Sequence, residues 1–275
     1  MEPREREIKL GGLRFHYLEC GRAVAPSLIL LHGFTGHART WDHVAAPLAD
    51  RFRVLALDQR GHGDSDWALD GDYRIASMAR DLAAFADVLC PAPFGLVGLS
   101  MGGRVAMAYA GSHPGRVERL VLVDIGPEIA PDGLTRIRTT VGNIPDELAS
   151  EEQAYLLLRA ASPRYSEPLL RHRIKHGFHR LPDGRLAWKY DKVLRAQARE
   201  DRRDVPDLWP DLARIDCPTL IVRGIESDVL SPQIAKRMLE TLKDGQLVEI
   251  PDAGHTVPGD QPEAFLAALR TFLVP

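Results

Sequence analysis

A serine lies between two glycines at the point where an apolar, β-rich run passes into helix-forming residues. The pattern is Gly98-x-Ser100-x-Gly102, and the apolar run before it covers residues 94–97. It predicts a buried parallel strand, a sharp turn and a helix, with the glycines leaving room for strand and helix to approach each other. A serine on such a turn is exposed at a helix N-terminus, where the backbone N–H of Met101 can donate to an oxyanion. The stretch predicts a nucleophilic serine.

A serine hydroxyl is a poor nucleophile until a base takes its proton, and the base needs a carboxylate to orient it. His255 fits the base, because it follows the last predicted strand. Asp228 fits the acid, because it lies just past Gly224 at the end of the preceding strand. We therefore predict a triad of Ser100, Asp228 and His255. Asp124, also at a strand end, is the alternative acid, since some triads take their carboxylate from that neighbouring loop; Glu226 is a weaker alternative.

Two glycine-rich loops follow the other apolar strands. The first, His32-Gly33-Phe34-Thr35-Gly36, comes directly after the buried strand 27–31, and we assign the second oxyanion donor to the backbone N–H of Phe34. The second loop follows the strand at 53–57 and contains Asp58, His62 and Asp64. Short polar side chains and glycines in such a loop make turns and brace their neighbours, so we do not expect direct catalysis from these three residues.

Strands and helices alternate along most of the chain. A hairpin is expected around Gly11-Gly12, and further strands are expected at 117–123, 218–224 and 246–250. This rhythm indicates a mostly parallel α/β sheet covered by helices on both faces. Between residues 127 and 212 no buried strand is evident. We therefore expect a core of residues 1–126 and 213–275 with an inserted helical cap at 127–212.

Composition limits the classes of partner. The chain has 275 residues, of which 45% are hydrophobic and 27% charged, with a formal net charge of −3. This balance gives no reason to expect nucleic acid or a membrane as partner, and it favours a small molecule. The charged N-terminus lacks the pattern of a secretory signal, and three widely spaced cysteines do not suggest a disulfide framework, so a cytoplasmic location is expected. We expect a monomer or a homodimer.

The motifs together resemble the α/β-hydrolase fold superfamily over nearly the whole chain. The set consists of His32-Gly33, Asp58-x-Arg60-Gly61-x-Gly63-x-Ser65, Gly98-x-Ser100-x-Gly102, Asp228 and His255. The resemblance implies an eight-stranded sheet whose second strand is antiparallel, with the triad and the two oxyanion donors as assigned above. It is similar to the single-cap branch of carboxylesterases, enol-lactonases and carbon–carbon bond hydrolases. A serine at the elbow disfavours the dehalogenase and epoxide-hydrolase branches, which use aspartate there.

A basic run at 171–180 lies within the expected cap. His172, His176 and His179 have the spacing of one helix face, but no carboxylate or cysteine accompanies them in the run and Gly177 interrupts the helix, so no metal site is expected. The arginines and Lys175 of the run could attract a carboxylate-bearing substrate, although a solvated basic face is the usual meaning of such a run.

Aromatic residues of the cap are candidates for lining a substrate pocket, because pockets favour aromatic side chains. Packing of the cap onto the core would explain them equally well. The candidates are Trp188, Tyr190, Tyr155 and Phe178, together with Trp209.

The sequence therefore predicts a cofactor-free serine hydrolase that cleaves a small carboxylic ester or lactone through an acyl-enzyme. One alternative is hydrolysis of a carbon–carbon bond in a dienoic diketone acid, in which Arg104 or a cap arginine would bind the carboxylate. A second is a perhydrolase or cofactor-free haloperoxidase, with peroxide as acceptor. A third, from another class, is a ligand receptor that uses the same scaffold without catalysis.

Overall fold

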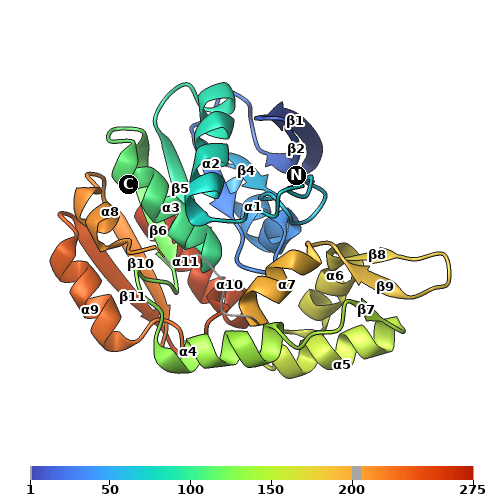
Figure 1. Ribbon diagram of the computed structural model, residues 1–275. Helices are drawn as coiled ribbons and strands as arrows, with labels where there is room; N and C mark the ends of the chain where they lie inside the picture. Colours follow the sequence, from blue (N-terminus) through green and yellow to red (C-terminus); the bar gives the residue numbers. More distant parts are fainter. Residues whose placement is uncertain (1, 200–205, 275) are drawn as a thin grey trace.

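The computed structural model describes residues 2–199 and 206–274, which form a twisted sheet flanked by helices with an inserted segment along one side (Figure 1). The eight strands have the order β1-β2-β4-β3-β5-β6-β10-β11. They are Arg4–Leu10, Leu13–Cys20, Arg53–Leu57, Ser27–Leu31, Phe94–Leu99, Val117–Val123, Thr219–Gly224 and Gly245–Ile250, in that order. Strand β2 is antiparallel to both of its neighbours and all other pairs are parallel. The predicted α/β-hydrolase fold is confirmed.

The N-terminal hairpin forms as predicted. Its turn consists of Gly11 and Gly12, with φ angles of 55° and 90°. A two-residue turn between antiparallel strands requires positive φ at both positions, which glycine adopts without strain. The hairpin supplies the antiparallel edge of the sheet.

Helices cover both faces of the sheet. One face carries α2 (Ile75–Leu89), α3 (Met101–Ser112), α8 (Trp209–Arg214) and α9 (Pro232–Thr241). The other carries η1 (Ala38–Trp41), α1 (Asp42–Leu48), α10 (Val257–Asp260) and α11 (Pro262–Leu273).

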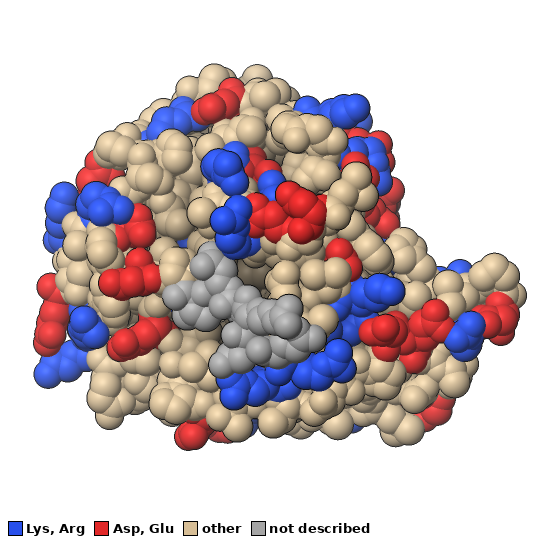
Figure 2. Space-filling view, viewed as in Figure 1, with Lys and Arg blue, Asp and Glu red and all other residues tan. Residues whose placement is uncertain are grey.

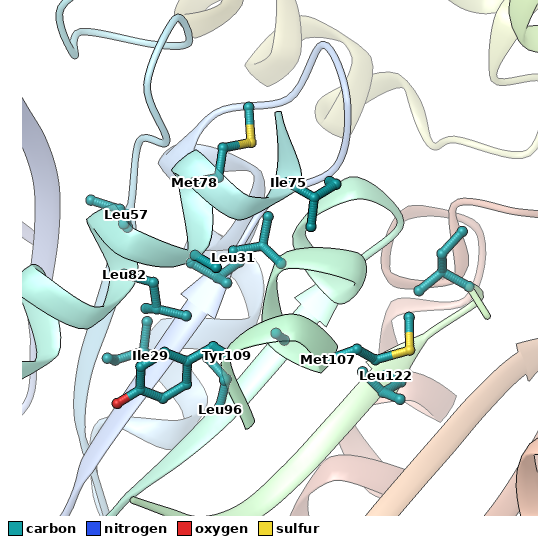
Figure 3. Close-up of a cluster of buried hydrophobic side chains, with 14 of the residues drawn as sticks. Ile29, Leu31, Leu57, Ile75, Met78, Leu82, Leu96, Met107, Tyr109 and Leu122 are labelled. Atoms are coloured by element: carbon teal, nitrogen blue, oxygen red, sulfur yellow. The ribbon is translucent and has the colours of Figure 1, made fainter. Parts of the chain in front are cut away.

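Each central strand contributes side chains to the helix layers on both faces of the sheet, because successive side chains point to opposite faces. In β3, Ile29 and Leu31 pack under α2 and α3 (Figure 3), whereas Leu28 and Leu30 pack under α1 and α11. Such continuous apolar strands are typical of a parallel sheet buried on both faces.

An inserted segment follows β6 and precedes α8 (Trp209–Arg214). Its helices are α4 (Pro131–Arg136), the π-helical turn η2 (Ile137–Val141), α5 (Glu151–Ala161), α6 (Glu167–Gly177) and α7 (Lys192–Arg199). It also contains a three-stranded antiparallel sheet of order β7-β9-β8, with strands Glu147–Leu148, Leu186–Trp188 and Phe178–Arg180. The sequence predicted a purely helical cap. Strands of two or three residues carry too little alternation to be distinguished from turns.

Helix α8 packs with the core, although the predicted cap extended to residue 212. The backbone of Asp211 comes so close to Gly111 of α3 that a Cβ there would lie 2.4 Å from the Asp211 carbonyl oxygen. The guanidinium of Arg214 also donates to the Gly111 carbonyl at 3.0 Å. The inserted segment therefore returns to the core before α8 begins.

The surface is mixed in charge. Figure 2 shows acidic and basic side chains interspersed over most of the visible face, with a group of basic side chains below the grey atoms. Cys20, Cys90 and Cys217 are all buried, as expected for core packing. Among the described residues, none of the helices has the length and apolar character required to cross a bilayer.

Candidate active site

Ser100 lies on a strained turn between β5 and α3. Its φ and ψ are 53° and −117°, a conformation that non-glycine residues rarely adopt. The flanking glycines make this turn possible: a Cβ on Gly98 would lie 2.4 Å from the Gly102 carbonyl oxygen, and one on Gly102 would lie 2.5 Å from that of Leu31. The predicted elbow is present, and the serine stands at the N-terminus of α3.

A chain of hydrogen bonds runs from Ser100 through His255 to Asp124. The Nε2 atom of His255 lies 2.9 Å from the Ser100 hydroxyl oxygen, and its Nδ1 atom lies 2.8 Å from an Asp124 carboxylate oxygen. Asp124 is fully buried. When Nδ1–H donates to this carboxylate, Nε2 is left as an acceptor for the serine proton.

The predicted acid, Asp228, makes no hydrogen bond to His255 in this structure: its carboxylate accepts two hydrogen bonds from the Arg136 guanidinium, at 2.5 and 2.9 Å, and Asp124 takes the predicted place beside the imidazole. Strand β6 pairs directly with the elbow strand β5, so Asp124 at its end lies beside Ser100, one strand nearer than the loop after β10. The other alternative, Glu226, is also engaged elsewhere, in an ion pair with Arg164.

The Asp124 carboxylate has further donors from the loop after β10. The Ser227 hydroxyl and the Gly224 backbone N–H both donate to it, the latter at 3.0 Å. A buried carboxylate is stable only when its oxygens are paired, and three donors meet that requirement. The sequence analysis did not single out Ser227. Ser227 could have been found from the sequence only because it directly precedes Asp228, in the loop that was expected to supply the carboxylate.

Asp260 holds the segment that carries His255. Its carboxylate accepts from the Gly254 backbone N–H at 2.8 Å and from the Thr256 hydroxyl at 3.3 Å. Burial raises the pKa of Asp260, and these hydrogen bonds oppose that effect. The residues on either side of the imidazole are thus fixed by one side chain, which sequence reasoning also missed.

The two predicted oxyanion donors come from different segments next to Ser100. Met101 follows Ser100 as the first residue of α3. Phe34 belongs to the loop after β3, in which a Cβ on Gly33 would lie 3.3 Å from the Ser100 Cβ. Thr35, with φ 64°, turns this loop back on itself. The close approach of the loop to Ser100 is the geometry that the assignment of Phe34 requires.

The second glycine-rich loop braces the first. Asp58 accepts from His16 Nδ1 at 2.7 Å and from the backbone N–H groups of Ala38 and Asp64 at 2.5 and 3.0 Å. Burial alone would raise the pKa of Asp58, but the hydrogen bond from His16 and the neighbouring histidines bring it to about 2. The ligand atoms of His16, Asp58 and Asp64 lie within 4.8 Å of one another, yet Lys189 pairs with Asp64 at 2.7 Å. These contacts agree with the bracing role predicted for the loop.

The three histidines of the basic run have different surroundings. His172 Nε2 lies 3.2 Å from an Asp42 oxygen, so a carboxylate does accompany it, although from a different part of the chain. The rings of His172 and His176 lie 4.6 Å apart, whereas His179 is exposed on β8. Within the described residues, these three do not form a cluster able to ligate a metal.

A cavity of about 450 Å³ lies between the cap and the carboxyl ends of the strands, and Ser100 and His255 open into it. Its walls combine the loop after β3 with side chains of α4, η2, α5 and α6. The apolar part of the lining consists of Phe34, Leu99, Ile137, Val141, Ile144, Leu157, Leu158, Ala161, Leu169 and Trp188. A cavity of this size and character suits a small organic substrate.

Of the aromatic candidates from the cap, Trp188 lines this cavity and the others do not. Phe178 packs behind Trp188 with the ring centroids 4.2 Å apart, and Tyr190 lies between Trp188 and His62. Tyr155 points outward and donates to Glu167 at 2.6 Å. Trp209 lies under the guanidinium of Arg237. Packing of the cap explains these four side chains.

Comparison with known proteins supports the fold and the class of chemistry. The profile of the alpha/beta hydrolase family matches residues 28–268. The chain is 31% identical to an esterase, Rv0045c, from Mycobacterium tuberculosis, over 90% of this chain and 83% of that protein. It is 31% identical to N-formylmaleamate deformylase from Pseudomonas putida, over 97% and 95% of the two chains.

The crystal structure of E-2-(acetamidomethylene)succinate hydrolase superimposes with a TM-score of 0.91 at 28% identity and covers 99% of this chain and 100% of that one. This superposition extends over nearly the whole length of both chains. The chain is a hydrolase and belongs to the alpha/beta hydrolase family.

Proposed function

We propose that this protein is a serine hydrolase that cleaves a small carboxylic ester or lactone through an acyl-enzyme, with Ser100 as nucleophile, His255 as base and Asp124 as acid. The observation that carries the proposal is the continuous hydrogen-bonded chain from Ser100 to Asp124, which opens into a largely apolar cavity. The 31% identity to a known esterase supports the reaction class. The charge balance and the buried cysteines support action on a small molecule in the cytoplasm.

The proposed reaction has two halves. His255 accepts the Ser100 proton as the hydroxyl oxygen attacks the carbonyl carbon, and Asp124 stabilises the resulting imidazolium. The backbone N–H groups of Phe34 and Met101 receive the oxyanion, and His255 then protonates the leaving alcohol. Water, deprotonated by His255, releases the acid from Ser100 and restores the enzyme. Burial of Asp124 keeps competing water away from its bond to the imidazole.

The proposal is tested with p-nitrophenyl esters from acetyl to octanoyl and with the variant Ser100→Ala. The wild type is expected to hydrolyse the short esters, and the variant should lose a factor of about 10⁴ or more in kcat, because the nucleophile is gone. Covalent labelling of the wild type, but not of the variant, by a fluorophosphonate gives a second readout. A variant that retained turnover would contradict the assignment of Ser100.

Hydrolysis of a carbon–carbon bond in a carboxylate-bearing substrate is the second candidate. It is favoured by two arginines, Arg136 and Arg173, in the lining of the cavity. Arg104, considered for this role from the sequence, is engaged elsewhere: its guanidinium donates to the Pro127 and Pro206 carbonyls at 2.9 Å each. A dienoic diketone acid offered as substrate distinguishes the two reactions.

A further inference from the structure

The polar side chains that line the cavity are unbalanced in charge. Two arginines, Arg136 and Arg173, and the histidines His37, His43, His172 and His255 contribute to its wall. Within the described residues, no aspartate or glutamate does so. The two charged side chains in the described lining are therefore both cationic, and in a partly enclosed space less water screens a guanidinium group than at an open surface.

The two arginines differ in how their charges are balanced. Arg136 is paired with the Asp228 carboxylate. Arg173 instead donates to the Ser162 hydroxyl at 3.4 Å, and among residues 2–199 and 206–274 no carboxylate lies within ion-pairing distance of its guanidinium. Arg173 is only partly exposed. A partly desolvated cation with a single long bond to a neutral hydroxyl retains most of its hydrogen-bonding capacity.

A second unsatisfied group lies in the same cavity wall. His37 is 6% exposed, and its Nε2 atom has no hydrogen-bond partner. This atom faces the end of α6: a Cβ on Gly177, one helical turn after Arg173, would lie 3.6 Å from His37 Nε2. Burial lowers the pKa of His37 to about 3, so its imidazole is neutral. Buried polar atoms without partners are rare in native proteins and require an explanation.

The neighbours of Arg173 on α6 show that this is not a solvated basic face. Arg171 and Lys175 are both exposed. Arg171 pairs with Glu167 at 2.8 Å and stacks over Tyr155, away from the cavity. Among the arginines and the lysine of the basic run, Arg173 therefore lines the cavity, whereas Arg171 and Lys175 are exposed to solvent.

We infer that Arg173, assisted by His37, forms a carboxylate subsite, so that the natural substrate is an ester or lactone that carries a second, free carboxylate. The guanidinium offers a planar pair of donors that matches the two oxygens of a carboxylate. This inference rests on the proposed function and adds the substrate class to it. The same subsite would hold the acid group in the carbon–carbon reaction.

The test compares two esters of equal length, monomethyl glutarate and methyl valerate, followed by proton release in a pH-stat. The wild type is expected to prefer the glutarate monoester by about 10- to 100-fold in kcat/KM, the range of a hydrogen-bonded charge contact. Arg173→Gln should remove most of this preference and Arg173→Lys should restore part of it. A wild type without preference, or an Arg173→Gln variant that loses equally on both esters, would overturn the inference.

Arg171→Gln is the matched control, since it removes a positive charge from the same helix outside the cavity, and the preference should be unaffected. A binding readout needs no turnover: glutarate should protect Ser100 of the wild type from fluorophosphonate labelling, whereas glutaramide should not. The subsite alone is refuted if the wild type hydrolyses methyl valerate, shows no preference for monomethyl glutarate, and is not protected by glutarate from labelling at Ser100. If the wild type is neither labelled nor active on any ester, the proposed function itself fails.

Discussion

Asp124 is hydrogen-bonded to the His255 imidazole and Asp228 is not, and the effect of this difference on kcat can be measured. Asp124→Asn is expected to lower kcat by about 10³- to 10⁴-fold, because an amide stabilises the wrong tautomer of His255. Asp228→Asn, in contrast, breaks only the ion pair with Arg136 and should change kcat by less than about 10-fold. Steady-state kinetics on one short ester compare the two. A larger loss from Asp228→Asn than from Asp124→Asn would reverse the assignment.

The sequence identified Ser100 and His255 correctly as a pair of neighbours, because each carries a local signal: the glycine elbow for one, and the turn after the last strand for the other. The acid has no such signal. Both Asp124 and Asp228 follow buried strands. The choice between them depends on a single turn, in which the Ser227 hydroxyl bonds to Asp124 and the Asp228 carboxylate bonds to Arg136. Arg136, the partner that draws Asp228 away, is distant in sequence and could not be foreseen.

At the scale of elements, the junction of β5 and α3 depends on glycines that have no room for a side chain. Gly98→Ala should destabilise the protein by several kcal/mol, because the added methyl group would meet backbone atoms of Gly102 and Gly103 at 2.4 to 2.6 Å. Gly115→Ala is the control: that residue has φ +74° but nothing within 4 Å of a Cβ, so only the backbone strain of about 1–2 kcal/mol is expected. Calorimetric unfolding of both variants provides the comparison, and equal losses would contradict it.

The elements of the core were predictable and those of the cap were only partly so. Core strands such as β3 and β5 are continuous apolar runs, whose length and composition admit one interpretation. Cap residues pack against one another through contacts between distant segments, such as Phe178 with Trp188. Composition identified aromatic residues there, but only the tertiary arrangement decides that Trp188 meets the cavity and that Tyr155 meets solvent.

For the whole molecule, buried histidines link stability to pH. Burial lowers the pKa of both His37 and His62 to about 3, whereas an unfolded histidine titrates near 6.5. Between these values the unfolded chain binds more protons, so the free energy of unfolding falls as the pH decreases below about 6.5. Each of the two should contribute a loss of about 2 kcal/mol by pH 5. The raised pKa of His16 acts in the opposite direction, while Asp58 matters only below about pH 4.

Urea unfolding at pH 7 and pH 5 measures this dependence, and His62→Asn should make it shallower, because one of the two neutral imidazoles is removed. The Nδ1 atom of His62 lies 3.0 Å from the Arg60 carbonyl oxygen, and its ring stacks on Tyr190. His62 has no place in the proposed reaction. If the free energy of unfolding of this variant changes between pH 7 and pH 5 as much as that of the wild type, other groups cause the loss of stability at low pH.

The position of Asp124 has a mechanical consequence. The inserted segment begins only three residues later, at Pro127, so if this segment moves to admit a substrate, we expect it to turn about a point next to the Asp124 carboxylate. Arg104 holds the backbone at this point, because its guanidinium donates to the carbonyls of Gly126 and Pro127 at 3.3 and 2.9 Å. We therefore expect any movement of the inserted segment to begin beyond Pro127 and to leave the Asp124 carboxylate in place.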